Sequence, residues 1–277
     1  TMKPLTIAAA LESGEYTVNS TIDTSPGFRR FGRFTIRDHR NYGVLDLTEI
    51  IVKSSNVGVS NIATDLGGDT LRNLYARLGL GQATGIGFPG EAVGVLPAPP
   101  KWRPVEESTL SYGYGMSVNA LQLAQAYMVI ANGGIRYPLS LMRQEQRPQG
   151  QRVLSEQVTR AVRDMLKQAV ARGTGKRARP GLYAAGGKTG TVHLVGANGY
   201  EDSQYKAIFA GMAPIDDPRI VTVVAVDAPQ AGEYYGGEVA APVFARVMGD
   251  ALRLLNVKPE LEVSETRVSQ VTSGGRG

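Results

Sequence analysis

The chain has 277 residues and a formal net charge of +5; 42% of its residues are hydrophobic and 20% are charged, which is ordinary for a globular protein with a sizeable core. The sequence has no cysteine, which excludes disulfides and thiolate metal sites. It has two histidines, so few are present to form a histidine metal site or a Ser-His-Asp triad. The basic residues are spread along the chain, so nucleic acid is not an expected partner, and no apolar run approaches the ~20 residues of a membrane span.

The N-terminal part of the sequence predicts three helical regions and one strand-and-turn region. In chain order these are a helix at 3–13, a mixed segment at 15–45, a helical region at 46–66 that is broken at "SSN", and a short helix at 69–81. Gly14 suits the left-handed residue that ends the first helix. Asp46 or Thr48 can cap the start of the next helical region.

The C-terminal part of the sequence changes from helical to strand-like periodicity. The predicted segments are a Pro- and Gly-rich loop at 85–104, helices at 117–134 and 155–175, strands at 183–195, 205–215 and 219–229, and a helix at 239–256. Asn119 and Ser155 are the expected caps of the two middle helices. This order predicts an α+β fold in which an N-terminal and a C-terminal helix cover a sheet. Residues 1–259 form the expected domain, followed by a polar, mobile tail at 260–277.

A Lys-Thr-Gly stretch lies in "GGKTGT", within the first of the three predicted strands. A phosphate-binding P-loop is not favoured, because residue 182 is leucine where that motif needs glycine and because no helix follows. One interpretation is a turn with a solvated lysine. The other is a strand edge of small residues that a substrate backbone can approach, where Lys188 and the hydroxyls of Thr189 and Thr191 hold a carboxylate.

The stretch "KSSNVG" falls at the break between two helical segments. Serine and asparagine favour such turns, so a purely structural role is one interpretation. The other is that the Ser54 hydroxyl relays a proton and the Asn56 amide pairs with a peptide bond of a substrate.

The opening "TMKPLT" places Lys3 and Pro4 in the first turn of the first predicted helix. Taken by itself, Lys3 is expected to be an ordinary surface lysine. A serine directly before Thr1 would complete the pattern S-x-x-K, in which the two side chains share one helix face. The positive end of the helix dipole would then favour a developing anion on that serine.

Three places in the sequence resemble, in this order, the S-x-x-K, S-x-N and K-T-G motifs of penicillin-binding proteins and serine β-lactamases. They are Lys3, then Ser54 with Asn56, and then Lys188 with Thr189 and Gly190. Longer stretches such as "KSSNVGVS", "SYGYGMSVNALQLAQAY" and "YYGGEVAAPVF" are similar to the transpeptidase domain of class B penicillin-binding proteins, in particular the division-type penicillin-binding protein 3. The resemblance implies a five-stranded antiparallel sheet between helices, an all-helical lobe beside it, and a site between the two.

The resemblance also implies a chemistry. A serine, expected immediately before Thr1, attacks the penultimate carbonyl of a peptidoglycan stem peptide that ends in D-Ala-D-Ala, releases the last D-Ala and becomes an ester. An amine from a neighbouring stem then takes the acyl group and forms a cross-link. Lys3 would be the base, Ser54 would pass the proton to the leaving amine, and Asn56 would hold the substrate amide. Lys188, Thr189 and Thr191 would bind the terminal carboxylate, and no cofactor is needed. β-Lactam antibiotics would acylate the same serine.

Further side chains are assigned by position in the family. Four tyrosines are expected to wall the cleft: Tyr114, Tyr200, Tyr234 and Tyr235. His193 lies one strand period beyond Thr191 and should face the same side of the sheet. Trp102, in the Pro-rich loop, either packs the loop down or touches substrate.

The resemblance places the protein in septal cell-wall synthesis at the periplasmic face of the bacterial inner membrane. It implies an N-terminal anchor that is not in this sequence, and division-complex membrane proteins as partners. Several other functions remain open: a β-lactamase, a D,D-carboxypeptidase, a penicillin sensor that does not turn over, or an inactive scaffold. A nucleophilic N-terminal threonine is disfavoured, because the residues that follow Thr1 are helical rather than strand-like.

Overall fold

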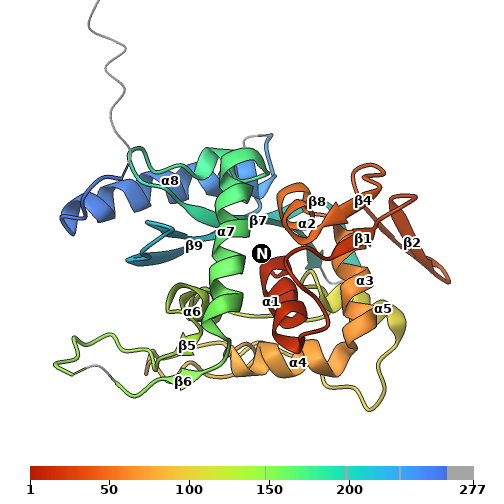
Figure 1. Ribbon diagram of the computed structural model, residues 1–277, viewed down its shortest axis with the longest axis horizontal. Helices are drawn as coiled ribbons and strands as arrows, with labels where there is room; N and C mark the ends of the chain where they lie inside the picture. The colour runs from red at the N-terminus through yellow and green to blue at the C-terminus, as the bar shows by residue number, and fades with distance from the viewer. Residues whose placement is uncertain (147, 197–198, 231, 261–277) are drawn as a thin grey trace, which may run out of the picture.

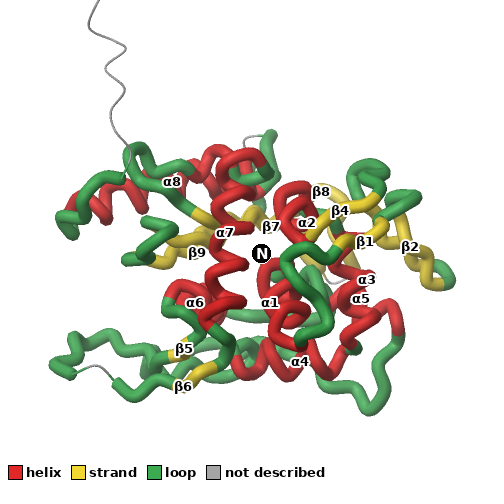
Figure 2. The backbone as a smooth tube through the Cα atoms, in the orientation of Figure 1, coloured by secondary structure: helices red, strands yellow, loops and turns green. Residues whose placement is uncertain are grey.

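The computed structural model describes residues 1–146, 148–196, 199–230 and 232–260, except for the side chains of residues 194–203. It is a mixed α/β structure in which a three-stranded antiparallel sheet lies beside a group of helices (Figures 1 and 2). None of the described helices is long and apolar enough to cross a membrane. The predicted tail lies, from residue 261 on, outside the described residues.

The helices of the described residues follow the sequence prediction closely. They are α1 (Lys3–Ser13), α2 (Leu47–Lys53), α3 (Asn56–Leu66), α4 (Gly68–Arg77), α5 (Pro104–Leu110), α6 (Ala120–Ala131), α7 (Glu156–Arg172) and α8 (Gly236–Leu254), with a 3₁₀ turn at Lys176–Ala178. The predicted caps are confirmed, because the side chains of Asp46, Asn119 and Ser155 each accept a hydrogen bond from a backbone N–H in the first turn of the helix that follows. The short helix α5 was not predicted.

The strands form one main sheet and three short ribbons. They are β1 (Thr21–Asp23), β2 (Phe28–Phe31), β3 (Phe34–Arg37), β4 (Val44–Asp46), β5 (Ile135–Arg136), β6 (Gln151–Arg152), β7 (Gly186–Gly196), β8 (Gly199–Ala213) and β9 (Ile220–Asp227). The main sheet has the order β7-β8-β9, and the ribbons pair β1 with β4, β2 with β3, and β5 with β6, all antiparallel. The three strands predicted from the residues are therefore confirmed. The five-stranded sheet implied by the resemblance is not seen among the described residues, where the main sheet has three strands.

Alternate residues of β8 belong to two different apolar clusters. Phe209 and Ala213 pack with residues of α8, whereas Ala210 and Met212 belong to the larger cluster formed mainly by helices. Because side chains alternate between the faces of a strand, α8 covers one face of the sheet, and helices cover the other. Figure 1 shows α7 crossing the sheet close to β7 and α8 lying along the sheet near its far end. The predicted cover by the C-terminal helix is confirmed.

The N-terminal helix does not cover the sheet as predicted. It packs mainly against α3 and α7, inside the group of helices (Figure 2). Leu5, Ile7, Ala8 and Ala10 of α1 are all fully buried and together point around most of the helix. A helix that is apolar on nearly all sides is stable only when other elements surround it, so α1 becomes the centre of the helical group.

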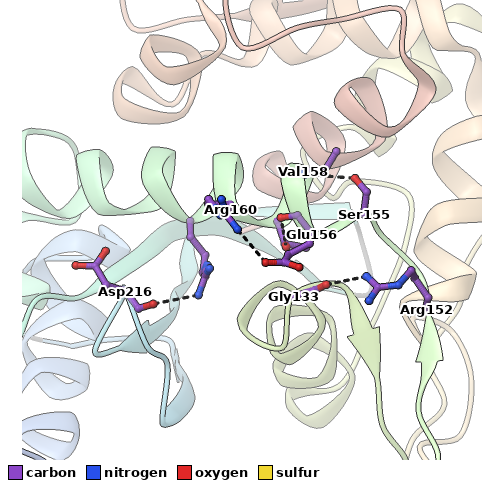
Figure 3. A network of polar contacts seen from close by, with 9 residues as sticks. Gly133, Arg152, Ser155, Glu156, Val158, Arg160 and Asp216 are labelled. Carbon is purple, nitrogen blue, oxygen red and sulfur yellow. Dashed lines mark hydrogen bonds and ion pairs between the residues drawn. The ribbon is translucent and has the colours of Figure 1, made fainter.

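Polar contacts fix the start of α7, the long helix beside the sheet. Figure 3 shows Ser155 accepting a hydrogen bond from the N–H of Val158 and, one turn further, Arg160 paired with Glu156 at 2.8 Å. The preceding strand β6 is held by Arg152, which donates to the carbonyl oxygen of Gly133 at 3.0 Å. These contacts fix the first turn of α7 and tie β6 to the turn that follows α6.

The Pro-rich loop is packed down by its tryptophan. The indole of Trp102 donates to Asp69 at 2.8 Å, and a Cβ added at Gly68 would lie 2.4 Å from the ring. Trp102 therefore packs the loop onto the start of α4, one of the two roles that the sequence left open. Gly68 is required there because any side chain would displace the indole.

Candidate active site

The three motifs line one cleft. Its volume is about 1120 Å³, and its wall includes Lys3, Ser54, Asn56 and residues 189–191. The first motif comes from the start of α1, the second from the junction of α2 and α3, and the third from β7. Lys188 points beneath this wall and is 1% exposed. The tertiary structure thus brings together residues that lie far apart in sequence.

Lys3 is buried at the start of α1, where Pro4 occupies the first turn without cost, because the N–H groups there have no helical partner. Its Nζ atom donates to the Ser54 hydroxyl at 3.0 Å and lies 5.9 Å from the centre of the Tyr112 ring. Burial lowers the pKa of Lys3 to about 8, although the negative charge of Asp38 partly opposes that shift. A substantial part of the Lys3 population is thus a neutral amine near neutral pH.

Ser54 has a left-handed backbone, with φ 59° and ψ 41°, where it ends α2. This conformation is uncommon for a residue other than glycine, and here the backbone N–H groups of Ser54 and Ser55 stabilise it by donating to the carbonyls of Ile51 and Ile50. The turn separates α2 from α3 and presents the Ser54 hydroxyl to Lys3. The break that the sequence predicted at "SSN" is therefore confirmed, and its geometry serves the cleft.

Asp38, at the end of β3, organises the same turn. Its carboxylate accepts hydrogen bonds from the hydroxyl of Ser55 at 2.5 Å, from the N–H of Asn56 at 2.6 Å and from the N–H of Val57 at 3.1 Å. The Asn56 amide in turn donates to the carbonyl oxygen of Arg37 at 3.0 Å. The second motif is thereby tied to a hairpin that lies 18 residues earlier in the chain.

The ammonium group of Lys188 lies among hydroxyl and carbonyl oxygens. It donates to the Thr189 hydroxyl at 3.1 Å, to the Thr189 carbonyl at 3.3 Å and to the Thr174 hydroxyl at 3.4 Å. Burial, followed by the positive charge of Lys3, lowers the pKa of Lys188 well below its ordinary value. Burial is also the cause that lowers the pKa of Lys3, so desolvation is the main reason for the shift of both amines.

Glycines let two segments, the start of α8 and the residues before α1, pack closely against β7. A Cβ added at Gly190 would lie 3.2 Å from the nitrogen of Thr1, and one at Gly236 would lie 2.4 Å from the carbonyl oxygen of Gly190. The Thr1 nitrogen donates to the carbonyl of Thr189 at 3.2 Å, and the N–H of Gly236 donates to the hydroxyl of Thr191 at 3.0 Å. The start of α8 and the residues before α1 are thus both held against the Lys-Thr-Gly strand.

Aromatic side chains line one side of the cleft. Tyr114, Tyr234 and Tyr235 belong to its wall, as the resemblance implied. The rings of Tyr205 and Tyr234 stack with their centres 4.1 Å apart, and His193 lies 4.4 Å from the ring of Tyr205. His193 therefore faces the cleft, as its spacing from Thr191 predicts. The side chain of Tyr200, also predicted for this wall, lies outside the described residues.

Sequence reasoning missed three residues of the site: Asp38, Thr174 and Tyr112. Asp38 lies in a segment whose pattern is mixed, and Thr174 follows the end of α7 in a turn, so no periodicity or motif marks either residue. Tyr112 lies in "SYGYG", where the resemblance marks Tyr114 and not Tyr112. In the part of the chain that the structure describes, no three His, Cys, Asp or Glu side chains gather as a metal site would need.

Residues 1–249 match the family model described as "Penicillin binding protein transpeptidase domain". The chain is 38% identical over 260 residues to a Pseudomonas aeruginosa protein named probable peptidoglycan D,D-transpeptidase PbpC, and 39% identical over 278 residues to peptidoglycan D,D-transpeptidase FtsI of Escherichia coli K12. These alignments cover 94% and 100% of this chain, but 46% and 47% of the relatives, so the chain spans about half of their length.

Solved structures agree with the sequence relatives. The apo structure of the TP domain of Burkholderia pseudomallei penicillin-binding protein 3 superposes with a TM-score of 0.89 at 41% identity, covering 94% of this chain and 80% of that one. A second structure, of a Burkholderia ambifaria peptidoglycan glycosyltransferase, gives a TM-score of 0.86 at 39% identity, covering 95% and 80%. By sequence and by fold, this chain belongs to the penicillin-binding protein transpeptidase domain family.

Proposed function

We propose that this chain is the catalytic domain of a peptidoglycan D,D-transpeptidase that cross-links stem peptides through a serine acyl-enzyme during septal cell-wall synthesis. The observation that carries the proposal is the 3.0 Å contact between the Lys3 amine and the Ser54 hydroxyl, in a cleft that is also lined by the Lys-Thr-Gly strand. Relatives with this family's domain carry the same activity in their names.

In this proposal the nucleophile is a serine that directly precedes Thr1, on the side of the cleft where the Thr1 nitrogen contacts β7. Lys3 accepts the proton of that serine. With a pKa of about 8, roughly a tenth of Lys3 is neutral at pH 7, against less than one part in a thousand for an ordinary lysine. Burial thus makes the amine a usable base without removing its ability to take up the proton.

Ser54 then acts as the proton relay between Lys3 and the leaving amine. Its hydroxyl already accepts a hydrogen bond from Lys3, and the same oxygen can donate a proton toward the cleft. Asn56 holds the substrate amide, and its own position is fixed through Asp38 and the carbonyl of Arg37. The acyl group finally passes to an amine of a neighbouring stem, which restores the serine hydroxyl.

The terminal carboxylate of the donor peptide binds at β7. Lys188, Thr189 and Thr191 supply a cation and two hydroxyls, and Gly190 lets Thr1 lie close to the strand that carries them. An anion bound there would raise the pKa of Lys188 and so favour its charged form. The backbone N–H groups of the serine and of Thr191 would stabilise the oxyanion, and losing one such donor typically costs about 3–4 kcal/mol of barrier.

Several broader assignments belong to the same proposal. The transpeptidase domain comprises residues 1–259 and the tail comprises 260–277. In the whole protein the main sheet has five strands. The two strands beyond β7, β8 and β9 pair with the edge of β9, because the cleft lies along the edge of β7. An anchor before this chain holds the domain at the periplasmic face of the inner membrane among division proteins. Tyr114, Tyr200, Tyr234 and Tyr235 contact substrate or β-lactam.

The intact mass of the whole protein, including the residue before Thr1, tests the proposal. Incubation with a β-lactam should add the mass of the opened drug, stably, and Lys3→Ala should abolish the gain. Lys53→Ala is the matched control, because Lys53 lies one position before the second motif but pairs with Glu49 on the surface. A wild-type protein that never gains this mass refutes the proposal, whereas rapid loss of the adduct assigns a β-lactamase instead.

A further inference from the structure

The hairpin of β2 and β3 carries an unusual concentration of positive charge. Between residues 28 and 40 the sequence contains five arginines, at positions 29, 30, 33, 37 and 40, and a single carboxylate, that of Asp38. Within the described residues, none of these arginines has an acidic partner within 4.0 Å. Figure 1 shows β2 at the outer edge of the molecule, beyond α3.

The one carboxylate of the hairpin does not neutralise the arginines. Asp38 already accepts three hydrogen bonds, from Ser55, Asn56 and Val57, and these donors occupy both of its oxygens. Its single negative charge offsets one of the five arginines at most, so the hairpin keeps a net positive charge for a ligand.

The two faces of the hairpin have different roles. Arg29 pairs with Ile36 across the ribbon, and on that face Ile36 is buried while Arg29 donates to the carbonyl of Ser60 and the hydroxyl of Thr64 on α3. This face attaches the hairpin to the helical lobe, so Arg29 is a structural residue.

The opposite face borders the cleft. Phe28 is paired with Arg37 and Arg30 with Thr35, and directly opposed residues share one face. Thr35 and Arg37 belong to the wall of the cleft. The guanidinium groups of Arg37 and Arg30 lie 5.5 Å and 6.0 Å from the centre of the Phe28 ring, which holds two cations in one place by cation–π attraction.

Arg37 is also fixed relative to the motifs. Its carbonyl accepts the side-chain amide of Asn56, and the next residue, Asp38, binds the backbone of the same turn. The backbone of Arg37 therefore has a defined place in the cleft wall, close to where Asn56 would hold the substrate amide.

We infer that Arg37, supported by Arg30 on the Phe28 ring, is a specificity-determining residue that binds a second carboxylate of the donor peptide, one not at its C-terminus. Arginine suits this task because its planar group binds a carboxylate through two parallel hydrogen bonds. The inference rests on the proposed function, since it concerns the same cleft, and Lys188 already serves the C-terminal carboxylate there.

The test compares two synthetic peptide thioester donors that carry the same D-amino acid at the scissile carbonyl and release the same mercapto acid on acylation. One carries a free carboxylate on a residue before the C-terminal one, and the other carries a carboxamide at that place. For the wild-type whole protein, kcat/KM for acylation should favour the acid over the amide by about twofold to fivefold, the range of an exposed ion pair. In Arg37→Gln this ratio should fall to about one, and Arg37→Lys should recover part of it. Because each ratio is taken within one variant, a loss of folded protein cancels.

Arg33→Gln is the matched control, because Arg33 stacks on Phe34 at the tip of the hairpin and does not border the cleft. It should keep the wild-type ratio. A ratio that survives in Arg37→Gln, or that Arg33→Gln lowers equally, overturns the inference. If the wild-type protein is acylated by neither donor nor by a β-lactam, the proposed function fails. The Kd values of the labelled acid and amide donors, measured by fluorescence anisotropy, then show by their ratio whether Arg37 binds the carboxylate.

Discussion

The amine of Lys3 donates a hydrogen bond to the hydroxyl of Ser54 across 3.0 Å, although 51 residues separate them in the sequence. Lys3 is held by the buried helix α1, and Ser54 is held by a left-handed turn between two helices. The pair joins a base with a lowered pKa to a group that can relay its proton.

Removing the Lys3 amine should slow acylation strongly. In Lys3→Ala the second-order rate of acylation by a fluorescent penicillin should fall by roughly 10²–10⁴-fold, the usual contribution of a general base. The rate of fluorescence gain on the protein band measures it. Thermal unfolding should show a folded protein, because alanine is the best helix former and the buried charge is removed. A loss smaller than tenfold would assign the base to another group.

The acylation rate should depend on pH through Lys3. Since the neutral amine is the reactive form and its pKa is about 8, the rate should rise about tenfold per pH unit below pH 7 and level off above pH 9. Stopped-flow acylation between pH 5.5 and 9.5 measures the profile. An inflection near 10.5 would mean that Lys3 is not desolvated in the working enzyme.

Asp38→Asn should move that inflection to lower pH. The carboxylate of Asp38 raises the pKa of Lys3, so removing its charge leaves burial unopposed and the neutral amine forms at lower pH. The same substitution weakens three hydrogen bonds at the start of α3, which should lower the free energy of unfolding by about 1–3 kcal/mol.

Asp46→Asn is the control for the Asp38 substitution. Asp46 caps α2 through the N–H of Glu49 and does not border the cleft. It should lower stability by at most about 1 kcal/mol, because asparagine caps nearly as well, and it should leave the pH profile unchanged. An equal pH shift in both variants would show a general effect of surface charge.

Gly236→Ala should separate α8 from β7. Its Cβ would lie 2.4 Å from the carbonyl oxygens of Gly190 and Ile208, so the strand or the helix start must move. We expect a loss of about 1–3 kcal/mol in the free energy of unfolding, as for overpacking, and slower acylation. Gly249→Ala in the same helix meets its nearest atom at 3.4 Å and should be neutral or stabilising by up to about 1 kcal/mol. Urea unfolding curves compare the two variants.

The sequence alone was sufficient for most local structure. Asp46, Asn119 and Ser155 begin helices because their side chains satisfy N–H groups that the helix itself leaves unpaired, a property of a few adjacent residues. The three strands of the main sheet are visible for a similar reason, since β-branched residues and turn signals are local. The order of Lys3, Ser54 and Lys188 along the chain was enough to indicate the family.

The tertiary structure decided what the local patterns do not contain. That α1 lies among helices and not on the sheet depends on which surfaces are free to surround an apolar helix. Asp38, Thr174 and Tyr112 enter the site because distant segments fold together, and no spacing in the sequence marks them. The pKa of Lys3 is likewise a tertiary property, because desolvation depends on what the folded chain places around the amine. Residue types and their order thus determined which reactive side chains this protein has, and long-range packing determined that these side chains lie together in one cleft.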